Sequence, residues 1–163
     1  METNYLIYGA VAVVIIIIAL YFMMSCKANQ VRIDGKCYDM LVQKEPVSSV
    51  AVTDLAKLID SDMTTAAGMT TSTVSLTLAS KDAKPLAKLQ GARIVAMVKA
   101  ATPATTDKVN LTLKSGDKSL PFEFPQDGKV LTVGKLFPAP LTDVSSLTLE
   151  VPANVTLYEV QLI

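Results

Sequence analysis

Two patterns of hydrophobic positions divide the chain. Tyr5 to Met24 form an unbroken run of 20 residues without a charged side chain. An α-helix of this length rises about 30 Å, which matches the hydrocarbon core of a bilayer. From Val47 onward, apolar and polar residues alternate instead, which is typical of strands with one buried face. The pattern predicts an N-terminal transmembrane helix followed by an all-β domain.

The residues around the apolar run favour a retained anchor in the lipid bilayer. Tyr5, Tyr8 and Tyr21 lie near its two ends, where amphipathic aromatic rings prefer the membrane interface. A cleaved signal peptide would need a positive leader and a small-residue cleavage site, but Glu2 precedes the run. A lipoprotein signal ending at Cys26 would also need a leading Lys or Arg. We therefore expect a single-pass anchor over residues 1–25.

The charges beside the anchor predict its orientation. Only Glu2 precedes the run, whereas four basic residues follow it within 20 positions: Lys27, Arg32, Lys36 and Lys44. The positive-inside rule then predicts that the C-terminal domain faces the cytosol. Two glycosylation sequons, at Asn110 and Asn154, would be usable only in the opposite topology. Both fall in predicted strands, so we interpret them as chance matches.

Residues 26–46 are predicted to form a short neck. Alternating residues on both sides of Asp34-Gly35 indicate a β-hairpin with a type I′ turn. A two-residue turn at this point would not place Cys26 and Cys37 opposite one another. We expect both cysteines to be free thiols, because cytosolic proteins are normally kept reduced. A disulfide between them is the alternative.

Residues 47–163 are predicted to form one antiparallel β-sandwich of the jelly-roll type. Turn signals separate short alternating segments, and no segment reads convincingly as a soluble helix. Phe122 and Phe124 flank Glu123 at alternate positions, so both rings are expected in the core. The expected strands cover residues 73–79, 92–98, 108–113, 118–124, 129–136, 146–151 and 155–160.

Two segments of this domain carry a family resemblance. Residues 58–65, LIDSDMTT, resemble the L-x-D-G-D-x-x-T loop of discoidin-like, galactose-binding-like domains. Residues 155–162, VTLYEVQL, resemble the closing strand of that family with its Glu. The order of loop, strands and closing Glu also agrees. The resemblance covers residues 47–163 and implies a galactose-binding-like jelly roll.

The acidic loop is a candidate metal site. Asp60, Asp62 and Thr65 place hard oxygen ligands within six residues, which suits Ca²⁺ better than zinc or copper. The resemblance implies that Glu159 of the closing strand completes a structural calcium site. Ser61 stands where the family has Gly, which restricts the backbone of the loop. The alternative is a turn that is capped by its own Asp side chains and holds no metal.

The amino-acid composition excludes several classes of function. Lys and Arg together number 15, as do Asp and Glu, so no basic face for nucleic acid is indicated. The chain has no His, which excludes Ser-His-Asp and Cys-His catalysis and His-ligated zinc. No nucleophile, base and orienting residue can be assembled, so we expect no enzyme.

The layout predicts a membrane-anchored structural or interaction protein. Its β-sandwich would dock on a coat or scaffold protein, as in a minor capsid protein of a membrane-containing virion. The alternative is a carbohydrate- or lipid-binding module displayed on a membrane surface. A sugar site would need exposed aromatic side chains, and the four aromatic residues of the domain are Phe122, Phe124, Phe137 and Tyr158.

Overall fold

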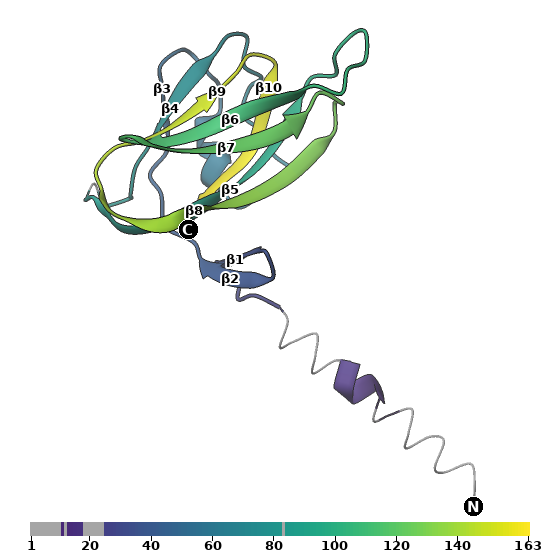
Figure 1. Cartoon of the computed structure of the whole chain (residues 1–163), viewed down its shortest axis with the longest axis vertical. Helices are drawn as coiled ribbons and strands as arrows, with labels where there is room; N and C mark the ends of the chain where they lie inside the picture. The colour runs from purple at the N-terminus through teal and green to yellow at the C-terminus, as the bar shows by residue number, and fades with distance from the viewer. Residues whose placement is uncertain (1–10, 12, 18–24, 83) are drawn as a thin grey trace, which may run out of the picture.

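The computed structural model describes residues 11, 13–17, 25–82 and 84–163 and shows an all-β antiparallel sandwich (Figure 1). One sheet has three strands in the order β10 (Val155–Leu162), β5 (Leu86–Val98) and β8 (Val130–Val144). The other has five, in the order β3 (Val47–Ser48), β4 (Val74–Leu78), β9 (Leu147–Val151), β6 (Lys108–Ser115) and β7 (Lys118–Pro125). The all-β, antiparallel fold class predicted from the alternation is correct.

Most of the predicted transmembrane span lies outside the described residues. Those that are described, Val11 and residues 13–17, are helical and are all Val or Ile with 51–59% of their surface exposed. Across the part of the chain that the structure describes, no helix is long and apolar enough to cross a membrane.

The core lies between the two sheets and comes from alternate strand positions. Leu111, Leu149 and Ile94 are fully buried and belong to one hydrophobic cluster. Phe122 and Phe124 are 0% and 1% exposed, so the prediction that both rings point inward is correct. A fully buried aromatic or Leu side chain contributes about 1.5–3 kcal/mol, so this layer supplies most of the driving force for folding.

Two strands are longer than their sequence patterns predicted. β5 begins at Leu86 rather than near residue 92, and an irregularity between Leu89 and Gly91 interrupts its pairing with β8. β8 continues to Val144 through Pro138 and Pro140. Both prolines lie between Leu136 and Leu141, where the pairing with β5 is interrupted, and β8 is an edge strand, so neither missing N–H breaks a paired position. A 3₁₀ helix, η1 (Leu55–Ile59), was also not predicted.

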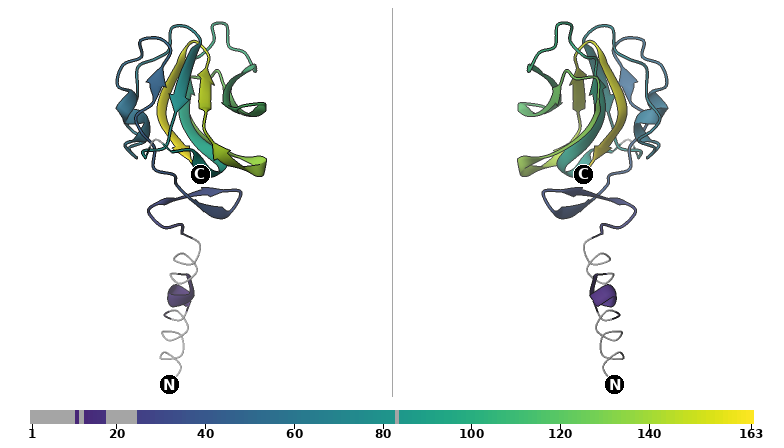
Figure 2. Two further views of the ribbon diagram at one scale, coloured as in Figure 1. Left: turned by 90° about the vertical axis from the view of Figure 1, so that its left-hand side faces the viewer. Right: turned by 90° about the vertical axis from the view of Figure 1, so that its right-hand side faces the viewer.

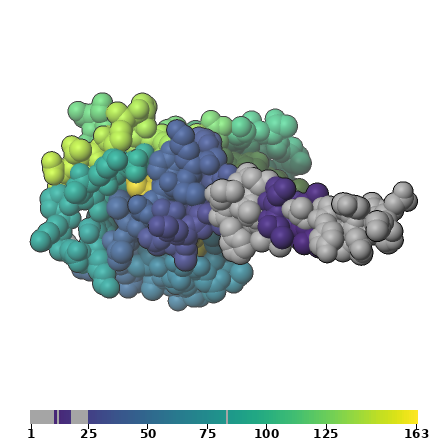
Figure 3. Space-filling view, turned by 90° about the horizontal axis from the view of Figure 1, so that it is seen from below, coloured from purple at the N-terminus to yellow at the C-terminus, as the bar shows by residue number. Residues whose placement is uncertain are grey.

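The neck contains a hairpin that packs against the sandwich. β1 (Gln30–Ile33) and β2 (Lys36–Asp39) are joined by Asp34 and Gly35, whose φ angles of 48° and 80° suit a type I′ turn. Val31 and Ile33 bury their side chains against Ile163, the residue after β10. Both further views show the hairpin beneath the sandwich (Figure 2), and in the view from below the neck lies in front of it (Figure 3).

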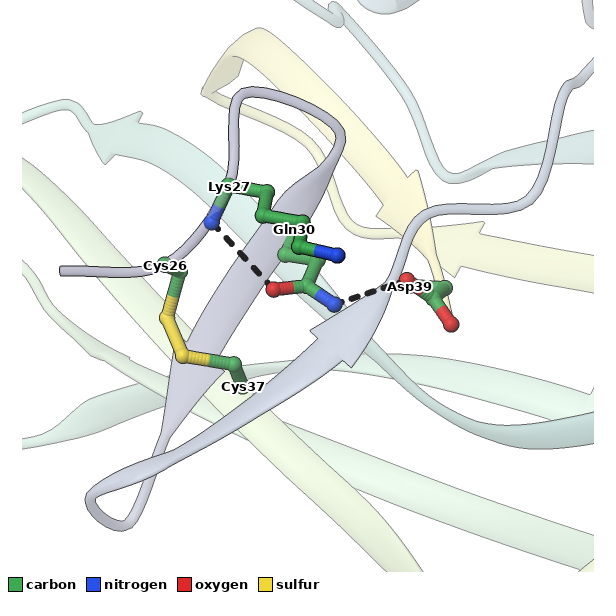
Figure 4. Close-up of a disulfide and its surroundings, with 5 residues drawn as sticks. All are labelled: Cys26, Lys27, Gln30, Cys37 and Asp39. Carbon is green, nitrogen blue, oxygen red and sulfur yellow. Dashed lines mark hydrogen bonds between the residues drawn. A yellow bond between two sulfur atoms is a disulfide. The ribbon is translucent and has the colours of Figure 1, made fainter. Parts of the chain in front are cut away.

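The prediction of free thiols is wrong, because Cys26 and Cys37 form a disulfide with a Cα–Cα distance of 5.5 Å (Figure 4). The cross-strand partner of Cys37 is Arg32, so the Asp34-Gly35 turn alone does not bring the cysteines together. A second turn does so, in which the Gln30 N–H donates to the Lys27 carbonyl at 2.9 Å. This turn, which was not predicted, leads the chain back toward β2 before β1 begins.

Candidate cation-binding pocket

β10 is an edge strand whose open side is covered by two loop segments. The Leu41 N–H donates to the Leu162 carbonyl at 2.8 Å near one end of the strand. At the other end, the N–H groups of Ala67 and Thr70 donate to the carbonyls of Leu157 and Val155, both at 2.9 Å. These contacts bring the neck and the acidic loop to the same strand.

A polar cluster lies on β10 between these two segments. Glu159 and Gln161 are 1% and 5% exposed, and they pair across the sheet with Val95 and Arg93 of β5. The register of β10 shifts between Leu157 and Glu159. Such a bulge changes the face to which the following side chains point. It accounts for a carboxyl group and an amide group on a strand whose other buried residues are apolar.

A pocket of about 220 Å³ adjoins this cluster. Its lining combines Glu159 and Gln161 with Ser61 of the acidic loop and with Met40 and Gln43 of the neck. The Gln43 side-chain amide donates to the Val160 carbonyl at 2.8 Å, which fixes this part of the neck against β10. The pocket therefore lies where the neck, the acidic loop and the closing strand meet.

Within the described part of the chain, no donor pairs with three buried oxygen atoms of the pocket residues: Gln43 Oε1, Glu159 Oε2 and Gln161 Oε1. Glu159 Oε1 accepts a hydrogen bond from Gln161 Nε2 at 3.0 Å. A buried acceptor without a donor is destabilising by about 1–3 kcal/mol. A bound cation would satisfy such oxygens, and oxygen-only ligands suit Ca²⁺.

Burial shifts the pKa values of Glu159 and of the neighbouring Arg93. It raises the pKa of Glu159 to about 7, and the negative charge of Asp60 adds to the rise. The hydrogen bond from Gln161, the positive charge of Arg93 and the nearby backbone N–H of Ser61 act in the opposite direction. Burial also lowers the pKa of the Arg93 guanidinium, while Glu159 opposes that change.

The acidic loop itself is capped by its own side chains. Asp60 accepts hydrogen bonds from the Asp62 N–H at 2.8 Å and from Thr65 Oγ1 at 2.9 Å. Asp62 accepts two from Thr64, at 2.9 Å from the N–H and 2.6 Å from Oγ1, and these bonds lower its pKa. Ser61 adopts a φ of 63°, the conformation for which Gly would be favoured.

The four predicted ligands are therefore only partly brought together. Asp60 lies close enough to Glu159 to influence its charge, but the oxygens of Asp62 and Thr65 are engaged within the turn. In the described ranges, no three His, Cys, Asp or Glu side chains gather as a metal cluster. The buried oxygens without a donor in this region belong instead to Glu159, Gln161 and Gln43. The two glutamines were not predicted. Gln161 follows Glu159 by two residues and Gln43 lies in the neck, and neither position matches a known metal-ligand motif.

Comparisons with known proteins give little further information. No family model matches the chain, and no curated protein matches it. Among solved structures, the C-terminal domain of a chitobiase from Bacteroides fragilis matches with a TM-score of 0.41 at 12% identity. The match covers 77% of this chain and 97% of that domain. A likeness at this TM-score is too weak to support an argument about function.

Proposed function

We propose that this is a non-enzymatic structural or interaction protein, tethered to a bilayer by Tyr5 to Met24, whose β-sandwich docks on a neighbouring protein layer. The observation that carries the proposal is the neck. Its hairpin is closed by the Cys26–Cys37 disulfide and buries Val31 and Ile33 against the sandwich. A flexible linker would let the domain explore a large volume, whereas this neck is a disulfide-closed hairpin packed against the domain.

The apolar helical residues support the tether. Val11 and residues 13–17 expose 51–59% of their surface, and each is Val or Ile. A helix that is apolar on every side is buried in protein or in lipid. Lipid is the environment that we propose, and the neck then places the sandwich next to the membrane.

A finer proposal concerns the fold and the setting. We propose that the sandwich is a galactose-binding-like jelly roll, with the buried Glu159 of β10 in the place of that family's closing Glu. In a membrane-containing virion, the neighbouring layer would be the coat and the protein a minor capsid component. This setting rests on the layout of anchor, neck and sandwich alone.

The alternative, a glycan- or lipid-binding module, has less support. Sugar recognition commonly uses exposed aromatic rings that stack on the ligand. Phe122, Phe124 and Phe137 are at most 6% exposed, and Tyr158 is half-buried on β10. The three Phe rings belong to the hydrophobic core and are not available to stack on a sugar.

A structural Ca²⁺ is a second, independent proposal. The predicted set of Asp60, Asp62, Thr65 and Glu159 stays a prediction, and the three buried oxygens without donors favour a cation in the same region. When bound, the cation would cross-link the neck to β10 through Gln43 and Glu159. Its role would be to stabilise the orientation of the domain.

Two observations give opposite indications of the side of the membrane on which the sandwich lies. The basic residues after the anchor favour a cytosol-facing domain. The disulfide favours an oxidising compartment, because cytosolic thiols are normally kept reduced. We give the disulfide more weight, since the orientation rule here compares only four basic residues with none. We therefore propose that the sandwich faces the non-cytosolic side.

Membrane extraction tests the tether. Full-length protein in its source membranes should resist extraction at alkaline pH and dissolve only in detergent. A variant with Ile15→Lys and Ile16→Lys should be released, because each charge in the bilayer centre is unfavourable by about 2.5–3.5 kcal/mol. A matched variant with Ile15→Leu and Ile16→Leu should stay bound. Release of the wild-type chain at alkaline pH would contradict the proposal.

A further inference from the structure

The two sequons of the chain lie in different structural settings. Asn110 lies in β6, opposite Glu123 of β7, whose carboxylate forms an ion pair with Lys108 at 2.9 Å. Asn154 lies in the turn between β9 and β10, immediately before Val155 begins β10. Val155 and Thr156 of the second sequon lie in β10, as predicted, whereas Asn154 itself lies in the preceding turn.

The turn presents the Asn154 side chain to solvent on a fixed backbone. The N–H of Asn154 donates to the Thr70 carbonyl at 2.7 Å, and its carbonyl accepts from the Lys99 N–H at 2.9 Å. Its φ is 64°, a conformation that Asn adopts more readily than most residues. The side chain itself is exposed. A sequon that accepts a glycan is expected in a surface loop of this kind.

Asn154 is also far from the neck hairpin. β10 runs from Val155 to Leu162, and Ile163 packs against the hairpin. Nine steps of about 3.4 Å place Asn154 at most roughly 31 Å from Ile163. Figure 1 shows β10 running from the far end of the sandwich to the neck. A bulky glycan at this end would not collide with the hairpin or with the surface beneath it.

We propose that Asn154 is an N-glycosylation site. The disulfide of the neck indicates the same oxidising compartment in which a glycosyltransferase acts. In the reaction, Nδ2 of Asn154 attacks the anomeric carbon of an oligosaccharide carried on a lipid pyrophosphate. The new C–N bond forms, the C–O bond to the pyrophosphate breaks with its electron pair, and the amide loses one proton. Thr156 supplies the hydroxyl that the Asn-X-Ser/Thr motif requires.

Translation of the full-length chain with endoplasmic reticulum microsomes tests this site. One glycan is expected, removed by an amidase that converts the modified Asn to Asp, which peptide mass spectrometry then locates at residue 154. Asn154→Asp and Thr156→Ala should abolish it, whereas Thr156→Ser and Asn110→Asp should retain it. Asp keeps the positive φ accessible, so Asn154→Asp perturbs the turn little.

An engineered sequon separates this proposal from the choice of topology. Ala104→Asn creates Asn-Thr-Thr at residues 104–106, in the exposed loop between β5 and β6. Glycan on residue 104 without glycan on Asn154 would overturn the site while leaving a non-cytosolic domain intact. Glycan on neither would overturn both the site and the topology. A glycan on Asn110 in place of Asn154 would also contradict the proposal.

Discussion

Glu159→Gln should alter how the stability of the protein depends on pH. The carboxyl is 1% exposed, and its pKa rises from 4.5 to about 7 in the folded chain. A group with a raised folded-state pKa stabilises the fold below its unfolded pKa and loses that contribution as the pH rises through its folded pKa. The free energy of unfolding of the wild-type protein should therefore fall between about pH 4.5 and pH 7.

The magnitude follows from the two pKa values. At about 1.4 kcal/mol per pH unit, the change from 4.5 to about 7 corresponds to at most about 3 kcal/mol. Gln has nearly the same shape, does not ionise, and keeps an oxygen that accepts from Gln161 Nε2. The variant should match the wild type near pH 4 and exceed its free energy of unfolding by up to about 3 kcal/mol near pH 8.

Urea unfolding of the full-length chain in mild detergent, followed by circular dichroism between pH 4 and pH 8, measures this difference. EGTA is included so that no divalent cation neutralises the carboxylate. Glu123→Gln is the matched control, because that exposed carboxyl has a pKa lowered by Lys108. It should reproduce the wild-type slope between pH 5 and pH 7. Equal slopes for Glu159→Gln and wild type in this range would refute the reasoning.

Three further changes test the pocket and the neck. Added Ca²⁺ should raise the melting temperature of the wild type relative to EGTA but not that of Glu159→Gln, and an unmoved wild-type temperature would exclude the cation site. Gly134→Ala would place a Cβ 2.8 Å from Ile33 Cγ1, so it should destabilise the packed hairpin by about 1–3 kcal/mol. The same substitution should destabilise the hairpin less in an Ile33→Ala background, where the clash is absent. Cys26→Ser with Cys37→Ser should lower the stability of the neck by about 3 kcal/mol and expose residues 27–36 to protease. Unchanged cleavage in that segment would show that the disulfide does not hold the neck.

Most strands of the two sheets could be predicted from the sequence, because each strand buries the side chains of one face. Alternation around Leu111 and Leu149 follows directly from the period of two along a strand. The full extent of β8 could not be predicted, because Pro138 and Pro140 normally end a strand and are tolerated here at an interruption in the pairing of an edge strand. Edge position depends on strand order, which local pattern does not encode.

The site was predicted only in part, for a similar reason. Glu159 is recognisable in its strand, and the acidic loop is recognisable from its spacing. The roles of Gln43 and Gln161 depend on the neck lying along β10, a contact between residues more than a hundred positions apart. The disulfide was missed because it needs two turns, and only the Asp34-Gly35 turn has a strong sequence signal.

Cross-linking mass spectrometry on intact source membranes or particles tests the central claim most directly. Lys57, Lys81, Lys88 and Lys118 are distributed over the sandwich and reach solvent. The proposed function predicts reproducible cross-links from a fixed subset of these lysines to one abundant coat or scaffold protein, which would also identify the docking face. Cross-links confined to the neck and its membrane neighbours, with all four lysines unlinked to any protein layer, would contradict it.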